Sequence, residues 1–160
     1  MISLLTHRAG RMINARHQHI PSADDGLWIA EGPGKWSRPL RFLNDNRGWV
    51  ELMRLAPGTR LGLHRHDGEV HAYNLQGERR LCTGEVVGEG DYVHEFDGNI
   101  DWWEAIGDKP LVLFVVVMGT VEYLGAKGEP GRRITTADRI ADYLRYCDAA
   151  GVVPAVPVQA

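Results

Sequence analysis

Three histidines and a glutamate crowd one short stretch of the chain, PGTRLGLHRHDGEVHAYNLQG, at residues 57–77. They are His64, His66, Glu69 and His71. Imidazoles and carboxylates are ligands that Fe(II), Mn, Ni and Zn take in proteins. Side chains two residues apart in a strand point to the same side, so His64 and His66 can reach one metal ion together. The same alternation places Glu69 and His71 on the opposite side, and the stretch therefore does not supply a complete site by itself.

The spacing of two histidines with one residue between them is a weak signal, because RHQH gives His17 and His19 the same spacing. That pair stands in a polar stretch with no strand pattern around it, which favours a solvated loop or tail. The later pair is more specific, since turn signals at Pro57-Gly58 and Asp67-Gly68 bound a short strand around it.

The elements that must hold these residues are short strands. Glycine and proline interrupt the middle of the chain at short intervals, as in EGPG, APG, DGN and GDKP. Between them, GWVELMRL alternates apolar and polar residues, and LVLFVVV is continuously apolar, as a strand buried on both faces would be. Short strands with frequent turn signals are typical of an all-β sandwich or barrel.

The C-terminal segment differs, because TTADRIADYLRYCDAAG has helical spacing. It predicts a helix over about residues 136–149, packed on the outside of the barrel. Thr135 and Asp138 fit a variant of the capping box, and Gly151 fits the helix end. With a barrel core over about residues 36–125, the whole chain, residues 1–160, is expected to form a single domain.

Charge and cysteine content narrow the class of protein. The formal net charge of −3 gives no reason to expect nucleic acid or an anionic membrane as a partner. Cys82 and Cys147 lie far apart, which suits a reducing compartment. The apolar run at residues 111–119 is too short to span a membrane, and the run before His7 is too short for a signal peptide. We therefore expect a soluble, cytoplasmic protein.

The stretch at 57–77 resembles the first cupin motif, in which a glycine precedes the two histidines by a fixed gap, here Gly58. GDYVHEFDGNIDWW matches the frame of the second cupin motif from Gly90, with Gly98 in place. Two motifs in register imply a single cupin domain, which is a jelly-roll-like β-barrel, here followed by the C-terminal α-helix.

Within the cupins, the chain resembles the small ketone- and diketone-cleaving dioxygenases, of the 2,4'-dihydroxyacetophenone dioxygenase and acetylacetone dioxygenase type. The segments that carry this likeness are LAPGTRLGLHRHDGEVHAY, GDYV, VVVMGTVEYL and YCDAAGV. The resemblance implies a mononuclear iron held by three histidines, a small ketone or diketone substrate, O2 as second substrate, and a homodimer.

This chain departs from that pattern at the third ligand. Where the second motif has its histidine, the chain has Asp101, so the resemblance carries over only His64 and His66 as ligands. Two histidines and one carboxylate are a sound set for Fe(II) with open positions for substrate and oxygen. We therefore expect Asp101 to complete the catalytic metal site, with Glu69 and His94 as the alternates.

Three residues are candidates for the walls of a substrate pocket. Trp102 and Trp103 follow Asp101 directly, so alternation predicts that one faces into the barrel and one away. Arg54 stands on the strand that leads into the first motif and could bind a carboxylate or enolate oxygen.

The sequence thus favours a metal-dependent cupin oxygenase, an Fe(II) dioxygenase that cleaves a C–C bond of a small diketone or hydroxyaryl ketone. A non-oxidative isomerase or hydrolase with Zn, Mn or Ni is one alternative. A catalytically silent ligand-binding cupin is the other, because cupins host many chemistries on one fold.

Overall fold

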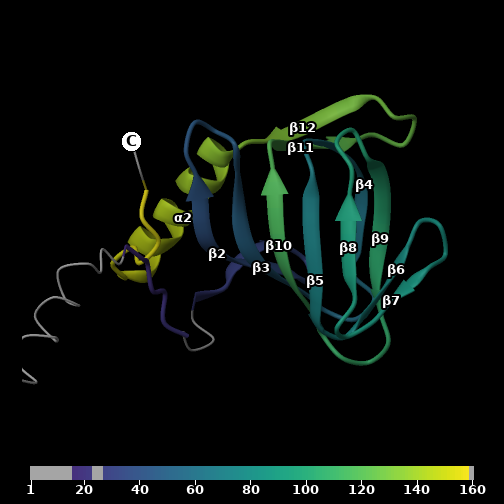
Figure 1. The fold of residues 1–160 in the computed structure, drawn as a ribbon, viewed down its shortest axis with the longest axis horizontal. Helices are drawn as coiled ribbons and strands as arrows, with labels where there is room; N and C mark the ends of the chain where they lie inside the picture. The colour runs from purple at the N-terminus through teal and green to yellow at the C-terminus, as the bar shows by residue number, and fades with distance from the viewer. Residues whose placement is uncertain (1–15, 23–26, 159–160) are drawn as a thin grey trace, which may run out of the picture.

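The structure is a computed structural model that describes residues 16–22 and 27–158 of the chain. Over these residues, strands form two six-stranded antiparallel sheets, and a helix follows near the C-terminal end (Figure 1). The prediction of an all-β barrel with a C-terminal helix is confirmed. Residues 1–15, on which the expectation about a signal peptide rests, lie outside the described part of the chain.

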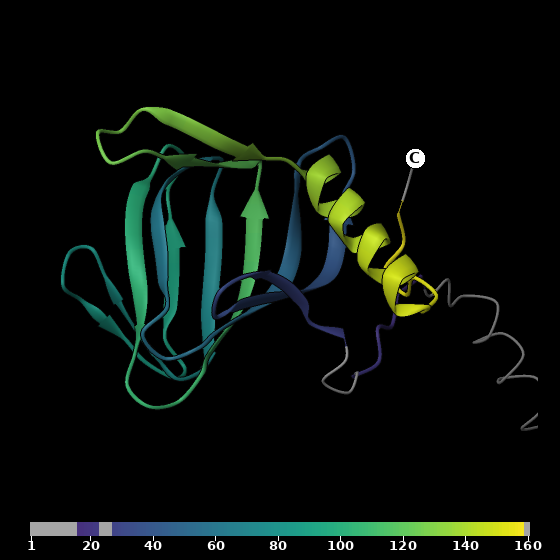
Figure 2. The ribbon, with the colours of Figure 1, turned by 180° about the vertical axis from the view of Figure 1, so that it is seen from behind.

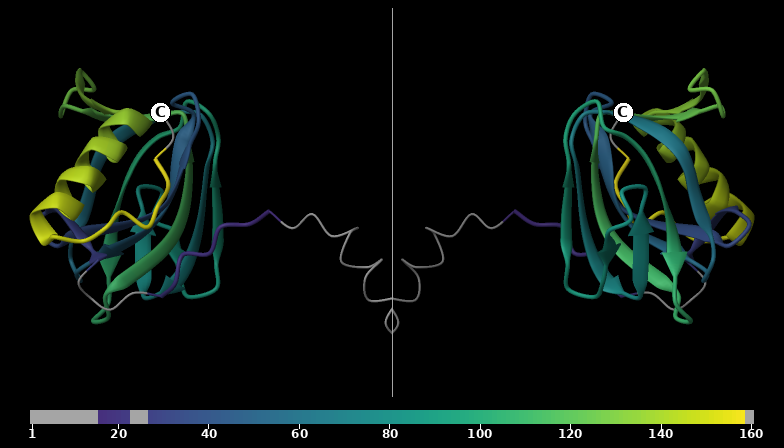
Figure 3. Two further views of the ribbon diagram at one scale, coloured as in Figure 1. Left: turned by 90° about the vertical axis from the view of Figure 1, so that its left-hand side faces the viewer. Right: turned by 90° about the vertical axis from the view of Figure 1, so that its right-hand side faces the viewer.

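The two sheets form two layers, which the side views show (Figure 3). The first sheet contains, in spatial order, β1 (Ile29–Gly32), β2 (Lys35–Leu43), β3 (Gly48–Leu55), β10 (Leu111–Met118), β5 (Val70–Gln76) and β8 (Tyr92–Glu95). The second contains β12 (Pro130–Ile134), β11 (Thr120–Leu124), β4 (Arg60–Asp67), β9 (Ile100–Ile106), β6 (Glu78–Leu81) and β7 (Val86–Val87). The strand β8 therefore lies at an edge of the first sheet and pairs with β5 alone.

Strand alternation continues without a slip from β4 into β5, although the chain crosses from one sheet to the other. His64 and His66 are buried in β4, and Val70 and Ala72 are buried in β5. The turn between the strands needs Gly68, whose φ is +125° and where a Cβ would lie 2.4 Å from the carbonyl oxygen of Met118. From His64 to Ala72 the even-numbered side chains therefore face the barrel interior and the odd-numbered ones face outward, whereas Leu61 faces inward because the pairing of β4 with β9 is irregular between Leu61 and His64.

The helix α2 (Thr136–Ala150) lies beside β2, seen from behind in Figure 2. It begins with the expected capping box between Thr135 and Asp138 and ends at Gly151, which is left-handed with φ 67°. Tyr143 packs its ring against Phe42 of β2, with ring centroids 5.7 Å apart.

A buried set of charges fixes α2 to the barrel. Arg139 of the helix donates hydrogen bonds to both Glu31 and Glu51 and to the hydroxyl of Ser37. Lys35 pairs with Glu31 at 3.1 Å. These residues are called the helix anchor below: Glu31, Lys35, Ser37, Glu51 and Arg139.

Two further expectations concern exposed segments. His17 and His19 are exposed and stand outside any strand, as the polar sequence around them predicts. Within residues 16–22 and 27–158, we find no helix with both the length and the apolar character needed to cross a membrane.

Candidate metal centre

His64 and His66 point from β4 into the barrel and lie almost fully out of solvent. Their rings are perpendicular, with centroids 4.8 Å apart. The Nδ1 of His64 lies 2.8 Å from the carbonyl oxygen of Gly62. A carbonyl oxygen only accepts, so Nδ1 carries the proton and Nε2 keeps its lone pair for a cation.

Glu95 of β8 reaches the same place from the other sheet. It pairs in register with the buried Val70 of β5, and its Oε2 lies 3.0 Å from Nε2 of His66. The ligand atoms of His64, His66 and Glu95 all lie within 4.8 Å of one another, and all three residues are buried. Neighbouring ligands at bonds of about 2.1 Å in an octahedral ion are about 3.0 Å apart, so these donors fit a divalent metal with small adjustments.

Asp101 borders this group on one side only. It lies opposite His64 in the pairing of β4 with β9, and its Oδ1 is 3.2 Å from Nε2 of His64. Both atoms are acceptors when Nδ1 of His64 carries the proton, so a proton or a cation must stand between them. The sequence placed Asp101 third in the ligand set, whereas the structure brings Glu95 to both histidines and Asp101 to His64 alone.

Burial and charge set the protonation of this group. Burial lowers the pKa of His64, which favours the neutral imidazole that metals bind. Burial alone would raise the pKa of Glu95, but its hydrogen bond to His66 and the nearby charges lower it below the ordinary value. Burial and the charge of Glu95 raise the pKa of Asp101. The group thus offers the neutral imidazole of His64 beside the ionised carboxylate of Glu95.

Arg79 of β6 is a buried cation whose charge acts on Glu95 and Asp101, and only 1% of its surface is exposed. Its guanidinium lies over the ring of Trp103, 4.9 Å from the centroid. Its Nε and Nη2 find no hydrogen-bond partner among the described residues. Unpaired buried donors are costly, so they indicate a place where an anionic or carbonyl oxygen would bind. We call His64, His66, Arg79, Glu95 and Asp101 the metal cluster.

A cavity inside the barrel connects these groups. Its volume is about 60 Å³, taken as the space open to the centres of water molecules. His64, His66, Glu95, Arg79 and Trp103 all line it. Most of the remaining wall is apolar: Met53, Leu61, Val70, Ala72, Leu113, Val115, Val117 and Val121. A small molecule with an apolar body and one or two polar oxygens suits such a space.

The two alternate ligands lie on the other side of the sheet. Glu69 and His94 group with His71 on the outer face and take no part in the interior cluster. Strand alternation explains this, because His71 pairs with His94 in register while Val70 pairs with Glu95.

Two of the three predicted pocket residues lie away from the cavity. Arg54 is held on the surface between the rings of Trp28 and Trp36, with Cζ 4.6 and 5.0 Å from their centroids. Trp102 points outward and stacks with Arg60, while Trp103 points inward and lines the cavity, so the predicted split of the two tryptophans is confirmed.

Comparisons with known proteins agree with this fold. The family model for the ChrR cupin-like domain matches residues 14–122, more than half of the chain. The chain belongs to this cupin family. Among curated proteins, none matches the chain by sequence.

Solved structures share the same cupin fold. An RmlC-like cupin protein from Ralstonia eutropha aligns with a TM-score of 0.76 and 21% identity, over 86% of this chain and 92% of that one. A second cupin-like protein of unknown function from the same organism aligns with a TM-score of 0.73 and 21% identity, over 91% and 99%. The acetylacetone dioxygenase of Acinetobacter johnsonii aligns with a TM-score of 0.72 and 14% identity, over 84% and 97%.

Sequence reasoning missed two residues of this cupin's interior, Glu95 and Arg79. Glu95 is the direct neighbour of the alternate ligand His94, and Arg79 is the direct neighbour of Arg80. His94 faces outward, and Arg80 is exposed and pairs with Glu104 at 3.2 Å. The signal that would have found Glu95 and Arg79 is the pairing of β8 with β5 and of β6 with β9, which fixes the inward side of each strand.

Proposed function

We propose that this cupin is a metal-dependent enzyme, a mononuclear non-haem Fe(II) dioxygenase that cleaves a C–C bond of a small diketone or hydroxyaryl ketone. The observation that carries the proposal is the buried group of His64, His66 and Glu95 at the wall of a largely apolar cavity. The shared fold with an acetylacetone dioxygenase supports the choice of substrate class.

In this proposal His64, His66 and Glu95 hold the ion, with Asp101 next to His64. Without metal, two carboxylates face one guanidinium, and a proton must stand between Asp101 and His64; a bound cation would take the place of that proton. When bound, the ion supplies Lewis-acid and redox chemistry toward substrate and O2.

The chain's own residues bind and orient the substrate. Arg79 offers Nε–H and Nη2–H to an enolate or carbonyl oxygen, and Trp103 under its guanidinium keeps those donors in place. The apolar wall excludes water, which strengthens the attraction between Arg79 and an anionic oxygen. Diketones form such an enolate when they lose the proton between their two carbonyl groups.

Metal analysis of matched variants tests the ligand assignment. We expect the full-length protein loaded with Fe(II) under anaerobic conditions to hold about one equivalent of iron in the interior. Glu95→Gln should lose most of this iron, and Asp101→Asn should retain more of it, since Asp101 contacts one histidine only. Retention of iron in Glu95→Gln together with loss in Asp101→Asn would instead favour the set His64, His66 and Asp101.

Oxygen uptake tests the reaction. With the iron-loaded protein, acetylacetone or a hydroxyacetophenone should drive O2 consumption, and both atoms of labelled O2 should appear in the two fragments of the cleaved substrate. The same preparation of His66→Gln is the control for uptake by free iron. Stoichiometric metal binding with no uptake on either substrate class would contradict the dioxygenase.

The two carboxylates of the metal cluster favour one further candidate function, a non-oxidative metal-dependent enzyme. Glu95 and Asp101 supply these carboxylates, and oxygen donors suit Mn as well as Fe, while His with carboxylate also suits Zn. A non-oxidative isomerase or hydrolase would then use the same cavity and the same Arg79. It predicts turnover of a small carbonyl compound with Mn or Zn and no consumption of O2.

A further inference from the structure

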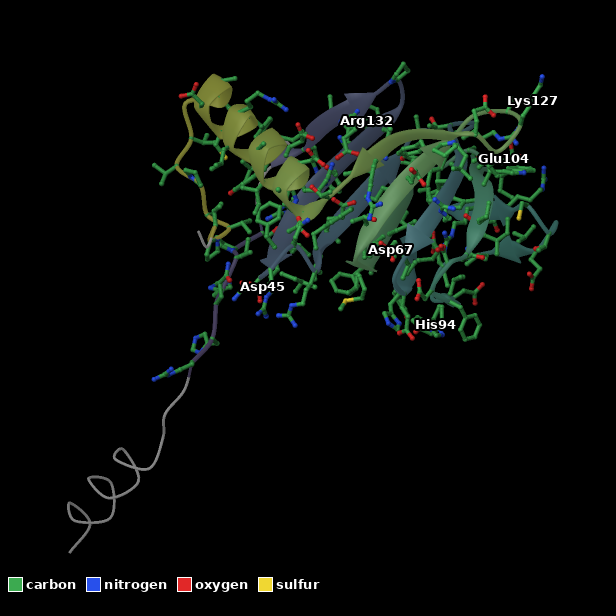
Figure 4. All side chains as sticks on the ribbon, turned by 90° about the horizontal axis from the view of Figure 1, so that it is seen from above. Asp45, Asp67, His94, Glu104, Lys127 and Arg132 are labelled. Carbon is green, nitrogen blue, oxygen red and sulfur yellow. The ribbon has the colours of Figure 1, made fainter. Side chains whose placement is uncertain are left out.

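A second group of metal-binding side chains lies on the outer face of the first sheet. Glu69 stands in the turn between β4 and β5, His71 lies in β5, and His94 lies opposite it in β8. Their ligand atoms all lie within 4.8 Å of one another. Figure 4 shows the side chain of His94 on the outside of the sheet, away from the barrel interior.

The two imidazoles are aligned toward the same carboxylate oxygen. Their rings stack in parallel planes, 2° apart, with centroids separated by 4.9 Å. Oε2 of Glu69 lies 3.5 Å from Nε2 of His71 and 3.6 Å from Nε2 of His94. Two ligands of a tetrahedral Zn²⁺ with bonds of about 2.05 Å are about 3.3 Å apart, so these separations are close to those of a bound ion.

Neighbouring aromatic residues support both histidines. The hydroxyl of Tyr92 lies 2.6 Å from Nδ1 of His71, and its oxygen accepts a hydrogen bond from Nδ1–H when Nε2 binds a cation. Phe96 packs on the ring of His94, with centroids 4.6 Å apart. Nε2 of His94 is shielded from water, and the described residues offer it no hydrogen bond. A cation between the three groups would satisfy it.

We propose that Glu69, His71 and His94 form a second metal site, separate from the interior one, that takes a divalent ion of the Zn²⁺ class. Two imidazoles and one carboxylate leave a fourth position open to water or to a ligand from solution. An ion at this site joins the edge strand β8 to β5, one residue before Glu95 of the interior cluster. Binding therefore stabilises the folded protein by mass action at the edge of the first sheet.

Equilibrium dialysis of the metal-free full-length protein against Zn²⁺ counts the sites. The wild type should bind two ions, and the double variant His71→Gln/His94→Gln should bind one. His64→Gln/His66→Gln should also bind one ion, at the outer site. The number of ions at the outer site can therefore be measured even if the interior assignment is wrong. The matched control is His17→Gln/His19→Gln, which removes the two exposed histidines of RHQH and should still bind two.

Two measurements separate a metal site from a simple contact between charged side chains. Zn²⁺ should raise the unfolding temperature of His64→Gln/His66→Gln. It should leave that temperature unchanged in the variant that also carries His71→Gln and His94→Gln. Tyr92→Phe should weaken the outer site about tenfold, because groups that orient a metal-binding imidazole affect affinity on that scale. Since His71 and His94 are partly exposed, their replacement by Gln should leave the unfolding temperature of the metal-free protein nearly unchanged.

An unchanged Zn²⁺ count and affinity in His71→Gln/His94→Gln would overturn the proposal. Loss of a Zn²⁺ ion only in His17→Gln/His19→Gln would overturn it as well, because the second ion would then belong to the N-terminal histidines.

Discussion

Two polar clusters line the same cavity of this barrel, and they differ in how their charges are satisfied. In the helix anchor, two carboxylates face two cations, and both Nη groups of Arg139 are occupied by side chains of the protein, so that only its Nε lacks a partner within the described residues. In the metal cluster, a carboxylate faces a histidine nitrogen that cannot donate to it, and two nitrogens of Arg79 have no partner within the described residues.

The difference separates a structural cluster from a binding site. A buried charge is costly unless it is paired, so a cluster that completes its own pairs serves the fold. A buried cluster that leaves donors and acceptors open is stable only if something else fills them. The helix anchor joins α2 to the barrel. The metal cluster has unpaired acceptors that a cation would bind and unpaired donors that an anionic oxygen would bind.

Replacement of the buried arginine in the helix anchor should have the largest effect on stability. Arg139→Met leaves Glu31 and Glu51 buried without their main cation, which should lower the free energy of unfolding by about 3–5 kcal/mol. Chemical denaturation measures this. The control Arg133→Met removes an exposed pair with Asp67 and should cost less than about 1 kcal/mol. Equal effects of the two variants would show that the anchor is not structural.

The same substitution in the metal cluster should act on binding instead. Arg79→Met removes a cation that makes no ion pair or hydrogen bond within the described part of the protein, so the loss of stability should be smaller than that of Arg139→Met. The affinity for acetylacetonate as a probe should fall about 10- to 100-fold, the usual value of a hydrogen bond to a charged group. The exposed Arg80→Met is the control and should leave this affinity unchanged. A large loss of stability with unchanged affinity would mean that Arg79 serves the fold and not the binding of the substrate.

The sequence could predict the parts of this comparison that depend on local alternation. It placed His64 and His66 on one face, put His71 and Glu69 on the other, and required one of Trp102 and Trp103 to face inward. Each of these follows from the period of two residues in a strand. The capping box of α2 could also be predicted from the sequence, because it involves two residues only three positions apart.

The parts that could not be predicted depend on which distant strands pair. Glu95 enters the cluster because β8 pairs with β5 across the intervening β6 and β7, and no local pattern encodes that register. Arg79 faces inward because β6 pairs with β9. The outward position of Arg54 is different, because it follows from the alternation within β3, where Met53 and Leu55 are buried on either side of it.

Acid should weaken the helix anchor in a predictable direction. Burial alone would raise the pKa of Glu31, but the charges of Arg139 and Lys35 lower it to about 2 from its ordinary 4.5. A carboxyl with a lowered pKa stabilises the fold fully above its unfolded pKa, and this contribution is lost as pH falls toward 2. Glu31→Gln should therefore cost up to about 3 kcal/mol at neutral pH and progressively less below pH 4.5.

Unfolding of wild type and Glu31→Gln across this pH range measures the difference. The exposed Glu78→Gln is the control and should stay within about 0.5 kcal/mol of wild type. A cost that grows as the pH falls would contradict the ion pairing of Glu31. Glu51 is less suited to the test, because burial raises its pKa while Arg139 acts in the opposite direction.

The smallest effect on stability should come from a change at the N-terminal cap of α2, the helix that contains Arg139 of the helix anchor. Thr135→Ala removes the side-chain oxygen that accepts from the backbone N–H of Asp138, and loss of such a cap costs about 1 kcal/mol. Thr135→Ser keeps the hydroxyl and should restore most of it. Metal content should not change, because the metal cluster lies on β4, β6, β8 and β9 and shares no element with the helix. Loss of metal from folded Thr135→Ala would mean that the two clusters, which line one cavity, are coupled through it after all.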